Sequence, residues 1–588
     1  MPRVKLPITE WLPAQGAMLN PGVIGVSEAI PLNGSWTLSP RVSFTKITSP
    51  STYSISQLYG FHIHSVASSV SQKWFFAGTN DKLLRGSAAD SVTMGTAIAA
   101  ATFSTPDADS GWQFSSFGNA IYATNGNFTD PIQYAATPST DFVKSNIVAA
   151  PVSYDPLCKY MTTIKNHLLI GNIKFAAAPS ASLPQSALTT TDYPYMVMWS
   201  ATDAPRRFGD PKAAPEILGS DYQDILDDYG PVTGMSGGDF AYIFKPRAVY
   251  VMEGPPWTFR PICIGIGTVY CNSIVRYFDD CFFWTPSGPV RIGPGKTEPE
   301  FIAQNKLYPI LTDQNLSLSI PHTSESSSVI AYTDYSSIYS SIFQNAINVS
   351  GWCDTVNGLI CWSFDPRTTL ADGKLVGSMI FVYSIKDDRW GFFQYSAEPF
   401  AQDGRSVVFV RSHPAHFLQR STLDSAYFLG GPDNSNIGVG QFLMSSGSDR
   451  LPAHKGTTIK TGFFSLPIAD SMESEKQSQA SRIIKIRPIY SMKYGEDYTV
   501  LSVELTVNSF TRFPDANGPH TVTISALSSA SYQQGEGWVS VNGPYALYHQ
   551  IEISILDDSL ANARYLTDFK AIEIEYAVMS GVGSTNKG

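Results

Sequence analysis

The sequence is poor in charged residues and has no long apolar run. Asp, Glu, Lys and Arg together make up 15% of the 588 residues, against about 25% in an average soluble domain. No stretch reaches the roughly 18 apolar residues that a membrane-spanning helix needs, and the opening "MPRVKLPITEWLPAQG" lacks the apolar core of a signal peptide. We therefore expect no membrane segment and synthesis in a cytoplasm.

Positive charge is the scarcer of the two signs. The 40 Lys and Arg residues are outnumbered by 50 Asp and Glu residues, so the formal net charge is −10. A protein that wraps nucleic acid needs clustered Lys and Arg to bind phosphates. The charge balance therefore argues against specific binding of DNA or RNA.

Cysteine is also sparse, and no C-x-x-C pair occurs. Six cysteines lie within apolar segments such as "RPICIGIG" and "GLICWSF". Free cysteine often acts as a small core residue, so we expect buried free thiols, although Cys263 and Cys271 could meet across a hairpin.

Glycine, proline and aromatic residues are abundant and favour an all-β fold. The chain has 45 glycines, 39 prolines and 12% aromatic residues, which suit turns and strands more than long surface helices. Five segments repeat a tight turn followed by an apolar strand, and each has Asn, Asp or Gly in the turn. These turns lie at Asn119, Asn166, Gly238, Asp280 and Asn357.

The apolar strands recur at intervals that suit a β-propeller. Several of the gaps between them are about 40 to 50 residues, the length of a four-stranded blade. The strand centres lie near Trp74, Ile121, Leu169, Tyr242, Phe283, Tyr332, Ile360 and Val408. The longer interval after Leu169 contains "DYQDILDDYG", which we interpret as an insertion or a full blade with a short helix. Stacked β-sandwiches share these turns and strand lengths and are the alternative fold.

The pattern changes after about residue 455, where apolar and polar residues alternate more strictly. The run "IEIEYAV" has the period of a sheet with one solvated face. We therefore predict a propeller over residues 51–455 and a β-sandwich domain over 456–588, with residues 469–481 as a loop. Residues 1–50 are predicted to be an extended arm that closes another sheet or crosses to a neighbouring molecule.

No segment has the residue pattern of a catalytic, cofactor or metal site. His62 and His64 would share one strand face, but no third ligand is near them in the sequence. The segment "DADSGWQF" is close to the Asp-box of sialidase propellers, although Trp112 follows Gly111 at once. Carboxylates of different blades could converge on a propeller axis, as a glycosidase requires. We expect a protein that is not an enzyme and that has no cofactor and no metal site.

The segment "PYMVMWSATDAPRRFGD" ends an apolar strand in a charged turn. Ser200 lacks the G-x-S-x-G pattern of an exposed nucleophile. We expect Asp203 to bond the turn backbone, Pro205 to fix its own φ and Phe208 to pack back onto the sheet. Arg206 and Arg207 would then face solvent or the carboxylates of a partner. The candidate site is this turn, which has a structural or interface role and comprises Trp199, Ser200, Asp203, Pro205, Arg206, Arg207 and Phe208.

Four successive segments resemble the tail nozzle and head-completion proteins of short-tailed bacteriophages, which stabilise the packaged DNA. They are "IKNHLLIGNI", "VMWSATDAPRRFGD", "DDYGPVTGMSGGDFAYIFKPRAVYVMEGPPWTFR" and "YFDDCFFWTPSGPVRIGPG", and they cover roughly residues 155 to 300. Ala204, between Asp203 and Pro205, departs from the family pattern. The matching positions are Asn166, Trp199, Ser200, Asp203, Pro205, Phe208, Gly230, Pro231, Gly234, Phe244, Thr258, Phe259, Trp284 and Gly288.

The resemblance implies a virion tail protein that is assembled in the host cytoplasm. Its partners would be copies of itself in a ring of six, the portal and adaptor proteins, and tail fibre or needle proteins. Genomic DNA would pass through the ring without specific binding. The alternative is a receptor-binding or carbohydrate-binding tail propeller, in which Trp257 and Trp284 would stack on sugar rings.

Overall fold

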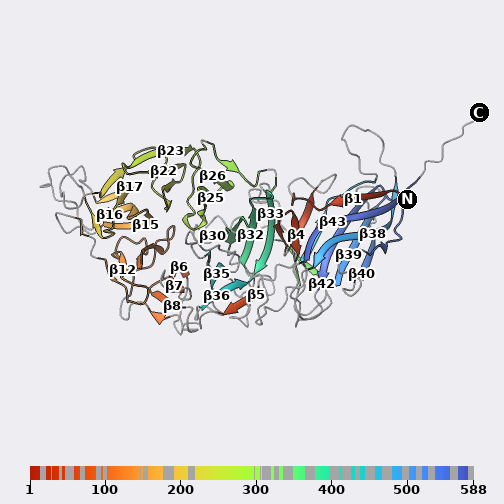
Figure 1. Cartoon of the computed structure of the whole chain (residues 1–588), viewed down its shortest axis with the longest axis horizontal. Coiled ribbons are helices and arrows are strands. Elements are labelled where there is room, and N and C mark those ends of the chain that lie inside the picture. Colours follow the sequence, from red (N-terminus) through yellow and green to blue (C-terminus); the bar gives the residue numbers. More distant parts are fainter. Residues whose placement is uncertain are drawn as a thin grey trace, which may run out of the picture.

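The computed structural model is all-β, and its sheets are almost entirely antiparallel (Figure 1). The strands are short and are joined by turns rich in Gly, Asn and Asp, as the composition predicts. The structure describes residues 1–12, 22–27, 29–38, 43–46, 58–65, 73–87, 95–96, 102–145, 148–149, 156–175, 191–209, 219–296, 298–304, 306–307, 319–323, 330–334, 349–355, 357–364, 378–395, 409–412, 426–430, 438–443, 457–466, 480–492, 502–511, 519–527, 537–556 and 567–579.

Seven sets of four antiparallel strands occur within the described residues, and we call them blades 1 to 7. Blade 1 is β6 (Leu58–Ser65), β7 (Lys73–Thr79), β8 (Leu83–Ser87) and β9 (Gly95–Thr96); blade 2 is β10 (Gln113–Phe117), β11 (Ala120–Thr124), β12 (Gln133–Ala135) and β13 (Val143–Lys144); blade 3 is β15 (Pro156–Ile164), β16 (His167–Phe175), β17 (Asp192–Trp199) and β19 (Asp221–Asp224); blade 4 is β20 (Gly234–Ser236), β21 (Ala241–Lys245), β22 (Ala248–Glu253) and β23 (Thr258–Ile264). Blade 5 is β24 (Val275–Tyr277), β25 (Asp280–Thr285), β26 (Gly288–Ile292) and β27 (Glu300–Phe301); blade 6 is β30 (Val349–Asp354), β31 (Leu359–Phe364), β32 (Ser378–Ser384) and β33 (Arg389–Tyr395); blade 7 is β34 (Phe409–Ser412), β35 (Ala426–Gly430), β36 (Gly438–Leu443) and β5 (Ser43–Lys46).

The first strands of the blades contact one another in a closed circle. β6 contacts β10, β10 contacts β15, and β15 contacts β20; further on, β24 contacts β30, β30 contacts β34, and β34 returns to β6. Blades 4 and 5 meet through Gly234, which lies against Ile274, and through Arg276, whose Nη1 donates to the Phe240 carbonyl at 2.7 Å. This circle is a β-propeller, with the first strand of each blade on its axis.

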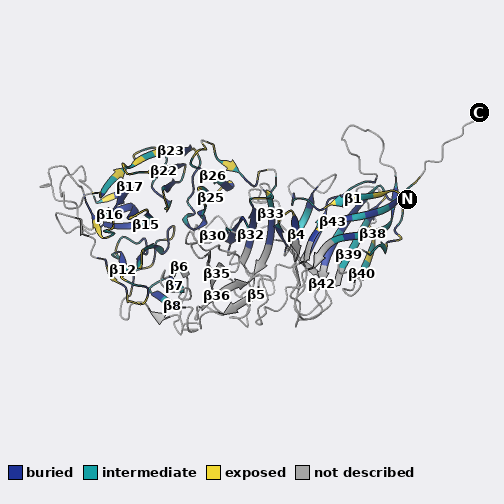
Figure 2. Ribbon diagram, viewed as in Figure 1, coloured by how far each residue is buried: buried dark blue, intermediate teal, exposed yellow. Residues whose placement is uncertain are grey.

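The five turns expected from the sequence connect the first and second strands of blades 2 to 6. The apolar segments that follow the turns are the second strands, and they are the most buried parts of their blades. Burial therefore decreases from the second strands to the outer strands. Figure 2 shows this decrease, with exposed residues on outer strands such as β23. The sequence pattern therefore identified the buried layer of the propeller.

The N-terminal residues pair with other parts of the chain. β5 lies beside β36 and completes blade 7, the first of the two possibilities that the sequence left open for residues 1–50. β1 (Arg3–Pro7) pairs with β43 (Thr567–Val578), and β2 (Val23–Ser27) pairs with β37 (Thr457–Thr461). The boundaries 1–50, 51–455 and 456–588 stay a prediction.

The C-terminal strands form two sheets that share one core, here called the two-layer unit. One layer contains β43 with β38 (Ser481–Met492), β41 (Val539–Ser540) and β1; the other contains β2, β37, β42 (Tyr548–Leu556), β39 (Ser502–Phe510) and β40 (His520–Leu527). Ile572 and Ile574 from the first layer pack in one cluster with Ile551 and Ile553 from the second. The alternation seen in the sequence therefore corresponds to one buried and one solvated face for each layer.

One continuous sheet joins the propeller to the two-layer unit. β3 (Ala29–Leu32) pairs with β33 of blade 6 and with β4 (Ser35–Leu38), which pairs with β43. Trp36 in β4 is fully buried, and its Nε1 donates to the Thr9 carbonyl at 2.8 Å. The ten-stranded sheet and its core thus couple the two parts (Figure 1).

Three details of the sequence interpretation need correction or lie outside the described residues. Tyr332 lies in β29 (Ile330–Asp334), which pairs with β28 (Ser319–Thr323) in a separate two-stranded ladder and not in a blade. The segment "DYQDILDDYG" begins with β19, the last strand of blade 3, and contains no helix, because its pairing with β17 outweighs its local propensity. Val408 and most of residues 469–481 lie outside the described residues.

Candidate functional site

The turn at residues 199–208 begins the connection between the third and fourth strands of blade 3. Trp199 ends β17, and β18 (Arg207–Phe208) pairs in parallel with β14 (Val148–Ala149). Trp199 is 4% exposed and Phe208 is 0% exposed, and the two side chains pack in different core clusters. Core aromatic residues therefore anchor both ends of the turn.

Ser200 is fully buried and bonds the backbone. Its Oγ accepts from Leu168 N at 2.9 Å and donates to Ala201 O at 3.1 Å. His167 Nδ1 lies 2.6 Å from the Ser200 carbonyl oxygen. The histidine therefore contacts the carbonyl of Ser200 and does not activate its hydroxyl.

Asp203 holds the turn by its main chain and not by its carboxylate. Its φ is +55°, and its N–H donates to Asn166 O at 2.9 Å, while the side chain is exposed. We expected Asp203 to bond the backbone without naming the atom, and the bond found here is made by its N–H. Aspartate tolerates the left-handed region better than most residues, which suits it to this position without a side-chain bond.

Pro205, Arg206 and Arg207 form the outer part of the turn. Pro205 is half-buried and both arginines are exposed. The Arg206 guanidinium carbon lies 4.9 Å from the centre of the Tyr134 ring, in the neighbouring blade 2. The arginine pair thus presents positive charge at the junction of blades 2 and 3, and its interface role stays a prediction.

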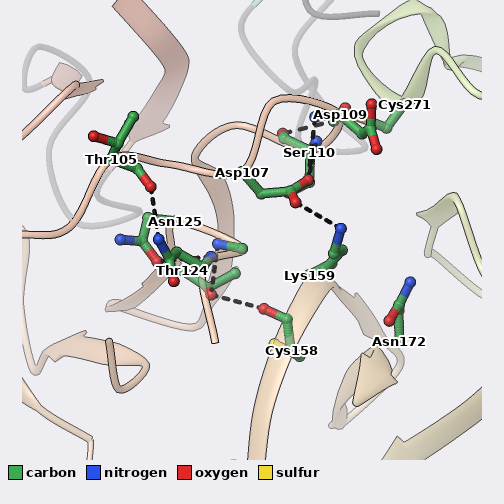
Figure 3. A network of polar contacts seen from close by, with 12 residues as sticks. Thr105, Asp107, Asp109, Ser110, Thr124, Asn125, Cys158, Lys159, Asn172 and Cys271 are labelled. Carbon is green, nitrogen blue, oxygen red and sulfur yellow. Dashed lines mark hydrogen bonds and ion pairs between the residues drawn. The ribbon is translucent and has the colours of Figure 1, made fainter. Parts of the chain in front are cut away.

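A polar network centres on Asp107, in the segment before blade 2 (Figure 3). Its Oδ1 accepts from Asp109 N at 3.1 Å, from Ser110 N at 3.0 Å and from the Ser110 hydroxyl at 3.1 Å. Its Oδ2 lies 2.6 Å from Lys159 Nζ on β15. The carboxylate therefore folds its own loop and ties it to blade 3.

Two neighbouring groups extend the network into the core. Asn125 O accepts from Asp107 N at 3.0 Å, and Thr124 Oγ1 donates to Cys158 O at 2.8 Å (Figure 3). Burial raises the pKa of the Cys158 thiol well above its usual range. This thiol is therefore held in its neutral, unreactive form.

The same loop reaches across the propeller axis to Cys271. The Cys271 Sγ lies 3.5 Å from Gln113 Nε2 and 3.5 Å from Asp109 O. Gln113 begins β10 of blade 2, whereas Cys271 precedes β24 of blade 5, and two blades separate them on the shorter side. The contact of Cys271 with Asp109 and Gln113 therefore spans the axis of the propeller. This contact with Cys271 was not predicted. The only pattern noted in the loop was the similarity of residues 107–114 to an Asp-box, which does not indicate a distant partner.

A second polar cluster lies between blades 3 and 4 around Lys245, which is 0% exposed. Its Nζ donates to Asp227 Oδ1 at 2.7 Å and to Ile225 O at 2.5 Å, and Tyr250 OH donates to Asp227 Oδ2 at 2.5 Å. Burial acts to raise the pKa of Asp227, but the hydrogen bonds from Lys245 and Tyr250 outweigh it and hold the pKa below its usual range. Burial raises the pKa of nearby Asp224, against the charge of Lys245. The cluster fixes the loop between the two blades.

The other residues weighed from the sequence have packing roles. His62 Nε2 and His64 Nδ1 lie 2.7 and 3.0 Å from Ser116 Oγ. Trp284 is fully buried against Trp362, so it cannot stack on a sugar. Trp257 is partly buried, and its ring centre lies 5.0 Å from that of His167 and 5.9 Å from that of Trp199.

The six cysteines are free, and four of them are buried, as expected. Across the described parts of the chain, no three His, Cys, Asp or Glu side chains gather closely enough to hold a metal ion. Among those residues there is also no helix with the length and apolar character needed to cross a bilayer.

Comparisons with known proteins identify distant structural similarity to WD40 β-propellers. The WD40 domain of Toxoplasma gondii coronin matches with a TM-score of 0.31 and 8% identity, over 69% of this chain and 91% of that domain. Kluyvelomyces marxianus Hsv2 matches with a TM-score of 0.29 and 9% identity, over 66% of this chain and 93% of its own. No protein-family profile and no curated protein sequence matches the chain.

Proposed function

We propose that this chain is a structural subunit of the tail nozzle of a short-tailed bacteriophage. In this proposal it forms a ring, with six copies as the expected number, below the portal and adaptor proteins. The ring retains the packaged genome and then lets it leave through its centre. The resemblance of residues 155 to 300 to nozzle proteins motivates the proposal.

The observation that carries the proposal is the ten-stranded sheet that joins blade 6 to the two-layer unit. Loose domains would let the shape of a ring vary, whereas a shared sheet and a shared core keep both parts in one orientation. A subunit of fixed shape with two distinct ends suits head-to-tail contacts in a closed ring.

The bridged axis limits where DNA could pass. Because Cys271 and Gln113 meet across the propeller, a duplex about 20 Å wide has no path along a single propeller axis. The opening would therefore lie between subunits. The net charge of −10 suits a wall past which phosphates move without being bound.

The rival proposal is a receptor-binding or carbohydrate-binding tail propeller. Of the two tryptophans that were expected to stack on sugar rings, one is not accessible. Trp284 lies in the core, and Trp257 is packed on His167 and Trp199. A sugar platform at Trp257 would have to use the part of the ring that those contacts leave open. No described contact favours this rival over the nozzle.

Imaging the tail of the assembled particle tests the proposal. The chain should be found as a ring around the tail axis, with portal and adaptor on one side and fibre or needle proteins docked outside. Trimers at the tail periphery that bind host glycans would refute the nozzle proposal and support the receptor-binding one.

A further inference from the structure

Phe278 occupies an unfavourable backbone conformation at an exposed turn. It lies at the tip of the β24–β25 hairpin with φ +53°, and 73% of the residue is exposed. The left-handed region suits Gly, Asn and Asp, and it is uncommon for a bulky aromatic residue. A residue that is both strained and exposed suggests that its side chain serves a purpose outside the fold.

Equivalent hairpins of other blades avoid this combination. Gly118 has φ +58° at the blade 2 hairpin, and Gly358 has φ +70° at the blade 6 hairpin. Lys165 has φ +47° at the blade 3 hairpin, but its Nζ donates to Gly254 O at 2.6 Å. Among these hairpins, blade 5 alone presents a large apolar side chain to solvent.

Arg276 holds the tip in place. Its Nε donates to Phe278 O at 3.0 Å, and its Nη1 donates to Phe240 O at 2.7 Å in blade 4. The guanidinium carbon lies 4.1 Å from the centre of the Phe240 ring, and the Tyr277 ring packs edge-on against Phe278 at 4.7 Å. The Phe278 backbone is therefore fixed before any partner arrives, which lowers the entropic cost of binding.

Two exposed carboxylates lie near Phe278, beside the guanidinium of Arg276. Asp279 follows Phe278 in the turn, and Asp239 lies at the tip of the adjacent blade 4 hairpin; both residues are exposed. The nearby Asp280 is already paired with Arg291. We call Phe278, Asp239 and Asp279 the acidic knob. A surface that accepts it must be apolar or aromatic at its centre and positively charged around it.

The outer face of the two-layer unit has that character. Glu575 on β43 lies opposite Arg3 on one side and Lys485 on the other, and Glu573 likewise lies opposite Lys5 and Arg487. Residues two apart on a strand share a face, so four cations and two carboxylates lie together on this face. The face carries an excess of two positive charges in a chain whose net charge is −10.

An aromatic ring lies within the same face. The guanidinium carbons of Arg3 and Arg487 lie 5.0 and 5.2 Å from the centre of the Trp538 ring. Arg3 is paired with Glu575 at 3.1 Å, and Arg487 is paired with Glu573. Lys5 and Lys485 have no such ion pair among the described residues. We call Trp538, Lys5 and Lys485 the cationic face.

We propose that the acidic knob of one copy docks on the cationic face of a second copy. Phe278 would pack beside Trp538, and Asp239 and Asp279 would pair with Lys5 and Lys485. The knob belongs to the propeller and the face to the two-layer unit, so the contact is head-to-tail and can repeat around a ring. The inference names the interface of the proposed nozzle ring and, in that respect, rests on the proposed function.

A charge swap in the full-length chain tests the contact. Sedimentation velocity at low ionic strength should show concentration-dependent association of the wild type that added salt weakens. Asp239→Lys with Asp279→Lys should weaken association about tenfold, and so should Lys5→Glu with Lys485→Glu. Mixing the two double variants should restore a heterodimer, because each retains one surface that fits the other. Lack of association in the wild type, or of recovery in the mixture, would overturn the inference.

Phe278→Gly separates docking from folding. The variant should abolish association and also raise the midpoint of denaturant unfolding, because glycine tolerates the positive φ. Ile264→Thr, on the outer strand of blade 4 where Ile264 is 59% exposed, is the matched control and should leave association unchanged. If Phe278→Gly associates as well as the wild type, the knob is not the contact.

The two proposals can fail separately. A ring around the tail axis whose subunits meet elsewhere would remove this interface and leave the nozzle function standing. Trimers at the tail periphery would remove the nozzle function, even if the charge swap succeeded in solution.

Discussion

Lys159 Nζ lies 2.6 Å from Asp107 Oδ2, and this ion pair fastens the loop before blade 2 to the first strand of blade 3. Both side chains are about one-fifth exposed, at 19% and 21%. The same carboxylate accepts three further hydrogen bonds within the loop. Asp107 thus organises the segment that crosses the propeller axis.

Asp107→Ala should lower the free energy of unfolding by about 2 to 3 kcal/mol, because it removes the ion pair and leaves the Asp109 and Ser110 donors without their acceptor. Asp109→Ala is the control and should change the stability by less than about 0.5 kcal/mol, since its carboxylate is exposed. Urea unfolding of the two variants measures both values. Equal losses would show that the Asp107 network does not stabilise the loop.

Lys245→Met should destabilise the chain by about 2 to 4 kcal/mol, because it leaves Asp227 largely buried without its cation. Adding Asp227→Asn should recover part of the loss, since no uncompensated charge then remains. Denaturant unfolding of the two single variants and the double variant measures the coupling. Strict additivity of the two losses would contradict the assigned pairing.

His549 should make the two-layer unit sensitive to acid. The residue is fully buried between Ser481 Oγ and Ser509 Oγ, and burial lowers its pKa from 6.5 to about 4. The folded state therefore favours neutral histidine. Its contribution, about 3 kcal/mol, should be complete above pH 6.5 and lost as the pH falls toward 4.

Urea unfolding at a series of pH values checks this expectation. In His549→Gln, the difference from the wild type should shrink as the pH falls through this window, because glutamine does not titrate. A difference that stays constant between pH 7 and 4 would show that His549 does not carry the acid sensitivity.

Arg206→Ala with Arg207→Ala should leave the unfolding free energy within about 0.5 kcal/mol of the wild type, because both side chains are exposed. The variant should either impair assembly or leave it unchanged, and it should not alter affinity for DNA. Thermal unfolding, particle assembly and a DNA mobility shift measure these outcomes. A loss of DNA binding would reveal a nucleic-acid contact that we do not expect.

Strands that follow a sharp turn could be predicted from the sequence, and those that pair over long distances could not. The turns at Asn119 and Asn357 lead into β11 and β31 as expected, because local turn chemistry fixes a hairpin. The place of β5 beside β36 has no local signal, because its partner lies almost 400 residues away. The strand pattern of the two-layer unit was predictable from another local signal, the alternation of apolar and polar residues.

The candidate turn was only partly predictable. Apolar residues at Trp199 and Phe208 indicated the buried ends of the turn, and both are in the core. The atom through which Asp203 bonds the backbone was not predictable, because a sequence does not tell a side-chain acceptor from a main-chain donor. Lys245 was missed as a buried cation, since lysine at the end of an apolar strand usually faces solvent.

The position of β5 sets an order of events during synthesis. Residues 43–46 leave the ribosome early, yet their partners, residues 440–443, are made almost 400 residues later. Blades 1 to 5 can take shape while translation continues, but the circle stays open until β36 emerges. During that interval β5 has a free edge, which can pair wrongly with another nascent chain on the same messenger. Slow translation or crowded polysomes should therefore favour intertwined products over single closed propellers.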